Sequence, residues 1–69
     1  MKISARNILK GKVIAITEGA VNDEVVLELF PGVQVTSIIT RASVSRLGLA
    51  VGKDAFAVIK ASDVMIGVD

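Results

Sequence analysis

The sequence predicts an all-β protein in which five strands and one short helix, between the third and fourth strands, form a small barrel. Segments rich in Val and Ile recur along the 69 residues, and turns containing Gly or Pro separate them. Helical spacing of apolar residues appears in only one place. At this length the chain is predicted to be one domain, residues 1–69, near the lower size limit for a self-sufficient core.

The first part of the chain predicts two strands joined by a turn. Gly11–Thr17 alternates weakly and is rich in Val and Ile, as is typical of a strand. Glu18–Ala20 is interpreted as a turn or bulge because Gly19 can take a positive φ. Val21–Phe30 is the second predicted strand.

The middle of the chain predicts a hairpin followed by the single helix. Pro31-Gly32 is a turn signal, because proline presets φ and glycine supplies a left-handed position. Val33–Thr40 is therefore predicted to be a third strand that pairs with the second. Thr40–Leu47 is predicted to be a short helix, with Thr40 as its cap and Gly48 just past its end.

Two further strands complete the predicted barrel. Gly52–Asp54 is interpreted as a turn, Ala55–Lys60 as the fourth strand and Val64–Val68 as the fifth, with a brief turn at Ala61–Asp63. This order of elements is the one expected of an OB-like barrel. Closure of the barrel would also remove the edge strands that favour aggregation.

Apolar content predicts association with further copies. Apolar residues make up 52% of the chain, more than a 69-residue monomer can bury, and no cysteine is present to form a disulfide. Several predicted strands are apolar on both faces, as in Val25-Val26-Leu27, Ile38-Ile39 and Val64-Met65-Ile66. We therefore expect an oligomer whose interfaces cover the surplus, with Met65 packed in the core or in such an interface.

Composition argues against several classes of protein. A net charge of +1 gives no basic footprint for nucleic acid or anionic lipid. No apolar run approaches the roughly 20 residues that cross a bilayer, and the polar residues after Lys2 are unlike a signal peptide. A soluble cytoplasmic protein is the simplest expectation. An enzyme is not expected, because histidine and cysteine are absent and Asp23 and Glu24, as neighbours on a strand, face opposite ways.

Hydrogen-bond donors occur near both ends of the chain, and a barrel would bring those ends together. Arg6 offers a planar fork of N–H groups and Lys60 a compact ammonium. Hydroxyl groups and backbone N–H groups lie beside them or at the helix start, at Ser4, Ala5, Thr40, Ala61 and Ser62. Such donors suit a tetrahedral dianion held without a metal. The alternative is that these residues are solvated strand ends and turn caps.

The same residues carry a resemblance to a known family. The chain resembles the molbindins, small Mop-type (TOBE) molybdate-binding proteins, over nearly its whole length. The resemblance rests on Ser4-Ala5-Arg6-Asn7, Leu9-Lys10-Gly11, Thr40, Leu47-Gly48, Gly52-Lys53 and Ile59-Lys60-Ala61. One departure is Ile8, where the family commonly has glutamine.

The resemblance implies a function and a set of site residues. It implies a cytoplasmic protein that stores molybdate, with tungstate as a second candidate anion, in a homohexamer built as a trimer of dimers. The implied site consists of Ser4, Ala5, Arg6, Lys60, Ala61 and Ser62 of one subunit and Thr40 of another. A second class of anion site on a symmetry axis would use the backbone of Gly19, Ala20 and Val21. Molybdenum is expected only as the oxyanion, with no metal site and no cofactor.

Two alternatives remain beside this interpretation. OB-like barrels bind nucleic acid through aromatic platforms and a basic groove. Here Phe30 and Phe56, the only aromatic residues (3% of the chain), are interpreted as core residues, which argues against that function. A regulatory module acting through a separate partner is the other alternative, because similar domains occur in molybdate transporters and regulators.

Overall fold

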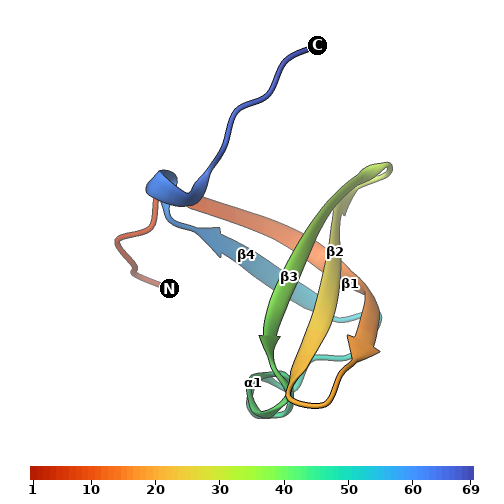
Figure 1. Cartoon of the computed structure of the whole chain (residues 1–69). Helices are drawn as coiled ribbons and strands as arrows, with labels where there is room; N and C mark the ends of the chain where they lie inside the picture. Colours follow the sequence, from red (N-terminus) through yellow and green to blue (C-terminus); the bar gives the residue numbers. More distant parts are fainter.

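A computed structural model describes residues 1–69 as a strongly curled antiparallel sheet with one short helix (Figure 1). The strand order in the sheet is β3-β2-β1-β4, so β3 and β4 are the two edge strands. The elements are β1 Asn7–Glu18, β2 Asn22–Phe30, β3 Val33–Thr40, α1 Arg41–Leu47, β4 Asp54–Ile59 and the 3₁₀ turn η1 Ala61–Asp63.

The curl originates in β1, whose two halves pair with different neighbours. Its first half pairs with β4, from Asn7 opposite Ile59 to Lys12 opposite Asp54, and its second half pairs with β2. A register shift between Val13 and Ala15 marks the bend, as a β-bulge would. The strand is therefore longer than the predicted Gly11–Thr17, because its polar first half is stabilised by distant β4.

The turn before β4 is fastened to this bend. The Gly52 N–H donates to the Val13 carbonyl at 2.8 Å, and the Val13 N–H donates to the Lys53 carbonyl at 2.9 Å. Lys12 reinforces the contact, since its Nζ lies 3.3 Å from an oxygen of Asp54. The bend thus sets the direction in which β4 leaves.

The hairpin and the helix are confirmed. β2 and β3 pair antiparallel around Pro31-Gly32, and Gly32 has a φ of 85°. Thr40 is the helix N-cap, and Gly48, with a φ of 65°, ends the helix. Both features depend on a few adjacent residues, which is why the sequence alone predicts them.

The buried core of one chain is small. Only 5 of 69 residues are buried, and the apolar ones are Val13, Val25 and Leu27. Half-buried side chains surround these three, namely Ile16, Ile39, Val44, Leu49, Ala55 and Ala57. A single chain therefore leaves most of its apolar side chains in contact with solvent, as the composition predicted.

The prediction of a fifth strand is wrong for the single chain. Val64–Val68 has no strand pairing and forms an extended tail after η1, so the sheet has four strands and the barrel is not closed. Figure 1 shows this tail projecting away from the sheet. The segment has the β-branched composition of a strand but no neighbouring strand with which to form hydrogen bonds.

Two interpretations of single residues are also wrong. Gly19 has no positive φ; instead, a Cβ there would collide with the carbonyl oxygen of Asn22, so a close backbone approach requires the glycine. Phe30 and Phe56 are 62% and 53% exposed, respectively, and do not belong to the core. Phe30 ends β2 beside the hairpin turn, and Phe56 lies on the strand face that carries Lys10 and Lys12 on β1. Met65 is also exposed and packs in no core of the single chain.

Candidate functional site

The structure brings the two ends of the predicted donor set together. Ser4, Ala5 and Arg6 directly precede β1, while Lys60, Ala61 and Ser62 directly follow β4. Asn7 and Ile59 are paired where these segments begin, and the Asn7 side-chain amide donates to the Ile59 carbonyl at 3.2 Å. The two segments therefore meet at one end of the sheet, beside η1 (Figure 1).

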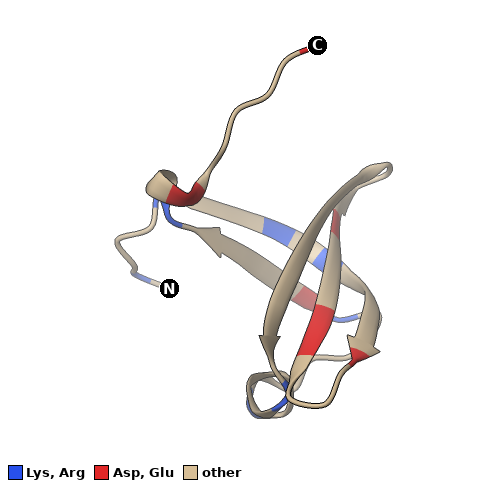
Figure 2. Ribbon diagram, in the orientation of Figure 1, with Lys and Arg blue, Asp and Glu red and all other residues tan.

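Both cations of this end are available for an anion. Arg6 and Lys60 are exposed and make no ion pair within the chain. Other basic residues are engaged, since Lys10 and Lys12 both approach Asp54. Asp63 in η1 is the acidic residue of this end (Figure 2). Two unpaired cations next to backbone N–H and hydroxyl donors form an arrangement suited to binding an oxyanion.

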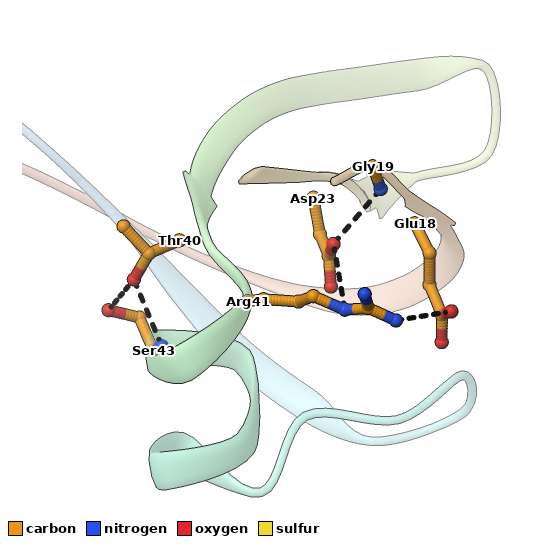
Figure 3. A network of polar contacts seen from close by, with 6 residues as sticks. All are labelled: Glu18, Gly19, Asp23, Thr40, Arg41 and Ser43. Carbon is orange, nitrogen blue, oxygen red and sulfur yellow. Dashed lines mark hydrogen bonds and ion pairs between the residues drawn. The ribbon is translucent and has the colours of Figure 1, made fainter. Parts of the chain in front are cut away.

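Thr40 lies at the opposite end of the sheet, next to α1. Its Oγ1 accepts the backbone N–H of Ser43 at 3.1 Å and donates to the Ser43 hydroxyl at 2.8 Å (Figure 3). The helix-cap interpretation of Thr40 is therefore confirmed. Within one chain, however, Thr40 is not brought to the end of the sheet that carries Arg6 and Lys60.

The loop assigned to a second site adjoins Thr40. Gly19, Ala20 and Val21 are exposed and join β1 to β2. The Val21 carbonyl accepts the backbone N–H of Arg41 at 2.9 Å, next in sequence to Thr40. One chain thus has two separate polar ends, with the N- and C-terminal donors at one and Thr40 with this loop at the other.

Sequence reasoning missed the charged network that supports the second end (Figure 3). Nη2 of Arg41 lies 2.8 Å from an oxygen of Glu18, and its Nε lies 3.9 Å from Oδ1 of Asp23. The same Oδ1 accepts the backbone N–H of Gly19 at 3.2 Å, although Asp23 is only 3% exposed. The available signal was the loop spacing, because an Asp four residues after Gly19 can accept the N–H of the loop's first glycine.

The charge distribution and the composition of the site limit its chemistry. Lys and Arg are interspersed with Asp and Glu over the sheet, so there is no continuous basic face (Figure 2). No group of three or more His, Cys, Asp or Glu residues is placed to hold a metal ion. No helix is both long enough and apolar enough to cross a membrane.

Comparison with known proteins identifies the family. A model described as the TOBE domain matches residues 3–66. The chain belongs to the TOBE-domain family. A probable molybdenum-pterin-binding protein of Haemophilus influenzae is 51% identical over 69 residues, and the alignment covers all of both chains. The resemblance to the molbindins, which rested on short motifs near both ends of the chain, is thereby confirmed.

Solved structures of other TOBE-domain proteins have the same fold. A molybdate-binding protein from Sporomusa ovata has a TM-score of 0.90 at 34% identity, with 99% of this chain and all of the other covered. ModG, a cytoplasmic molybdate-binding protein solved with molybdate bound, has a TM-score of 0.94 at 52% identity. All of this chain but 49% of ModG is covered in that comparison. The curled antiparallel sheet with one short helix is thus the fold of molybdate-binding members of the family.

Proposed function

We propose that this TOBE-domain chain binds molybdate at interfaces between copies of itself. The donors would be Ser4, Ala5, Arg6, Lys60, Ala61 and Ser62 of one copy and Thr40 of another. One observation supports the proposal most directly: donor segments from both ends of the chain meet at one end of the sheet, with both cations unpaired. The molybdate-binding relatives support the choice of ligand.

Binding would replace the hydration shell of the dianion with fixed N–H and O–H donors. Arg6 and Lys60 supply charge-assisted hydrogen bonds, and backbone N–H groups and hydroxyls complete the shell. No cofactor and no catalytic step are involved. Sulfate carries the same charge but is smaller, so discrimination against it would come from the size of the interface cavity. Tungstate, with the same shape and charge as molybdate, is expected to bind as well.

A homo-oligomer follows from the positions of the donors. Thr40 and Arg6 lie at opposite ends of one sheet, so a site that includes both needs two copies (Figure 1). We expect the hexamer, a trimer of dimers, that the family resemblance implies, with the Gly19–Val21 loops forming a second anion site on an axis. The cellular role would be storage of molybdate in the cytoplasm for later use in cofactor synthesis.

Matched charge variants test the site. Arg6→Gln and Lys60→Gln each remove one cation, and we expect either to weaken molybdate binding about 10- to 100-fold, because a hydrogen bond to a charged group contributes about 1.5–3 kcal/mol. Lys53→Gln is the control, since Lys53 is also exposed and has no ion pair. Isothermal titration calorimetry gives the three affinities. Equal affinities for all three variants would reject this site.

The nucleic-acid alternative retains one supporting observation. Phe30 and Phe56 are exposed, so both rings are accessible for stacking on bases, contrary to the expectation from sequence. Against this, Lys10 and Lys12 near Phe56 are engaged with Asp54, and no basic groove accompanies either ring. Tight, salt-sensitive binding of single-stranded DNA by the purified protein would favour this alternative.

A further inference from the structure

An apolar groove runs between the two edge strands of the curled sheet. Its volume is about 690 Å³, and 12 of its 15 lining residues are hydrophobic. β3 contributes Val35, Ser37 and Ile39, and β4 contributes every residue from Asp54 to Ile59. Because consecutive residues of β4 line it, the groove includes the hydrogen-bonding edge of that strand as well as one face. An open strand edge next to an apolar interior is the surface that accepts an added strand.

The C-terminal tail has the properties of such a strand. Residues 64–68 are extended, with no strand pairing, and Met65, Ile66 and Val68 are 93%, 87% and 93% exposed, respectively. Side chains alternate along an extended segment, so Val64, Ile66 and Val68 share one face. These three β-branched residues have the β propensity and the apolar surface that the groove interior would accommodate. Five extended residues span about 17 Å, comparable to the six residues of β4.

The tail of the same chain points elsewhere. The η1 turn closes with hydrogen bonds from the Asp63 N–H to the Lys60 carbonyl at 2.9 Å and from the Val64 N–H to the Ala61 carbonyl at 3.3 Å. After this turn the tail projects away from the sheet (Figure 1). An exposed apolar strand and an apolar groove of matching length therefore occur on one chain without meeting.

We propose that residues 64–68 of one copy insert between β3 and β4 of a second copy, as the fifth strand that completes its barrel. The exchange is reciprocal, so two copies close two barrels, and the contact is the same on both sides. Val64, Ile66 and Val68 enter the interior lined by Ala55 and Ala57, while Met65 faces outward. The inference rests on the homo-oligomer of the proposed function and specifies how two copies of it are joined.

Engineered cysteines test the exchange, since the chain has none of its own. Ser37→Cys in β3 or Ala57→Cys in β4 is combined with Val64→Cys or Ile66→Cys in the tail. The four double variants sample different registers of the inserted strand, because a disulfide needs Cα atoms about 4.4–6.8 Å apart. After mild oxidation, we expect at least one variant to run as a reducible covalent dimer on a denaturing gel. Val51→Cys with Ile66→Cys is the control, because exposed Val51 does not line the groove.

Two outcomes would overturn the exchange. A disulfide within one chain, seen as a faster-running monomer, would mean that the tail folds back into its own groove. The absence of any cross-link in all four variants would mean that the tail does not enter the groove.

A second pair of variants tests the proposed faces of the tail without cysteines. Ile66→Asp puts a charge into the apolar interior, whereas Met65→Asp places it on the outward face. We expect Ile66→Asp to shift the protein from dimer or larger assembly to monomer in sedimentation, at a concentration where Met65→Asp remains assembled. Loss of assembly in both variants, or in neither, would contradict the assignment of faces. Circular dichroism reports whether each variant retains its strands.

The outcome is separable from that of the proposed function. Molybdate titration of the unmodified protein tests binding without reference to the tail. A protein that binds molybdate but forms only intrachain disulfides rejects the exchange and leaves the proposed function in place. A protein that forms the interchain disulfide but takes up no molybdate rejects the function and leaves the exchange in place.

Discussion

Adjacent residues on a strand can differ completely in their contribution, and Asp23 and Glu24 are the best case here. Asp23 is buried, accepts the Gly19 N–H and lies near Arg41, whereas Glu24 is exposed and has no ion pair. We expect Asp23→Ala to lower the free energy of unfolding by about 1–3 kcal/mol, because it leaves a backbone N–H and a cation without their acceptor. Glu24→Ala, the matched control, should change it by less than about 0.5 kcal/mol.

Urea denaturation of the two variants at equal protein concentration measures this difference. Similar losses for both would show that the Asp23 contacts contribute little to stability. The polar network was not predictable from sequence, since the acceptor and its partners come from β2, the β1–β2 loop and the start of α1. The alternation rule placed Asp23 and Glu24 on opposite faces correctly but could not show which face is buried.

At the scale of elements, Thr40 connects a helix to the proposed site. Its hydroxyl caps α1 through Ser43, so loss of binding in Thr40→Ala could reflect a damaged helix instead of a lost ligand contact. Thr40→Asp separates the two roles, because Asp is an equally good N-cap but its charge repels a dianion. We expect Thr40→Asp to keep the stability of the parent and to lose molybdate binding.

Thr40→Ala provides the comparison, with an expected loss of about 1 kcal/mol of stability from the missing cap. Thermal unfolding followed by calorimetric titration distinguishes the two variants. Undiminished molybdate binding by Thr40→Asp would remove Thr40 from the proposed site.

Elements defined by local residues were predictable, and elements defined by distant partners were not. Pro31-Gly32 and the Thr40–Gly48 pair fix a turn and a helix through adjacent residues, and both were predicted correctly. The first half of β1 is polar in sequence and becomes a strand because β4 pairs with it from about fifty residues away. Residues 64–68 show the converse, since strand-forming residues without a partner remain a tail.

At the scale of the whole molecule, one chain is incomplete in two respects. Its apolar side chains are mostly exposed, and its candidate anion donors are divided between two ends of the sheet. The first could be predicted from composition, and the meeting of Arg6 and Lys60 from the expectation of a barrel. The exposure of Phe30 and Phe56 could not, because hydrophobicity does not reveal whether a residue faces a core or an interface.

Assembly and ligand binding should therefore stabilise one another. A ligand that binds only the assembled state adds about 2.7 kcal/mol per site at a free concentration one hundred times its Kd. We expect the midpoint of thermal unfolding to rise with molybdate, to rise with protein concentration, and to respond little to the same concentration of sulfate. Scanning calorimetry over a series of both anions checks this. A midpoint that is independent of protein concentration would contradict an obligate assembly.

Native mass spectrometry of the unmodified protein, titrated first with molybdate and then with sulfate, tests the central claim most directly. Sites formed between copies predict a discrete oligomer that takes up molybdate in defined steps and takes up no sulfate under the same conditions. A monomer that binds molybdate would contradict the interface site, and an oligomer that binds neither anion would contradict the proposed function.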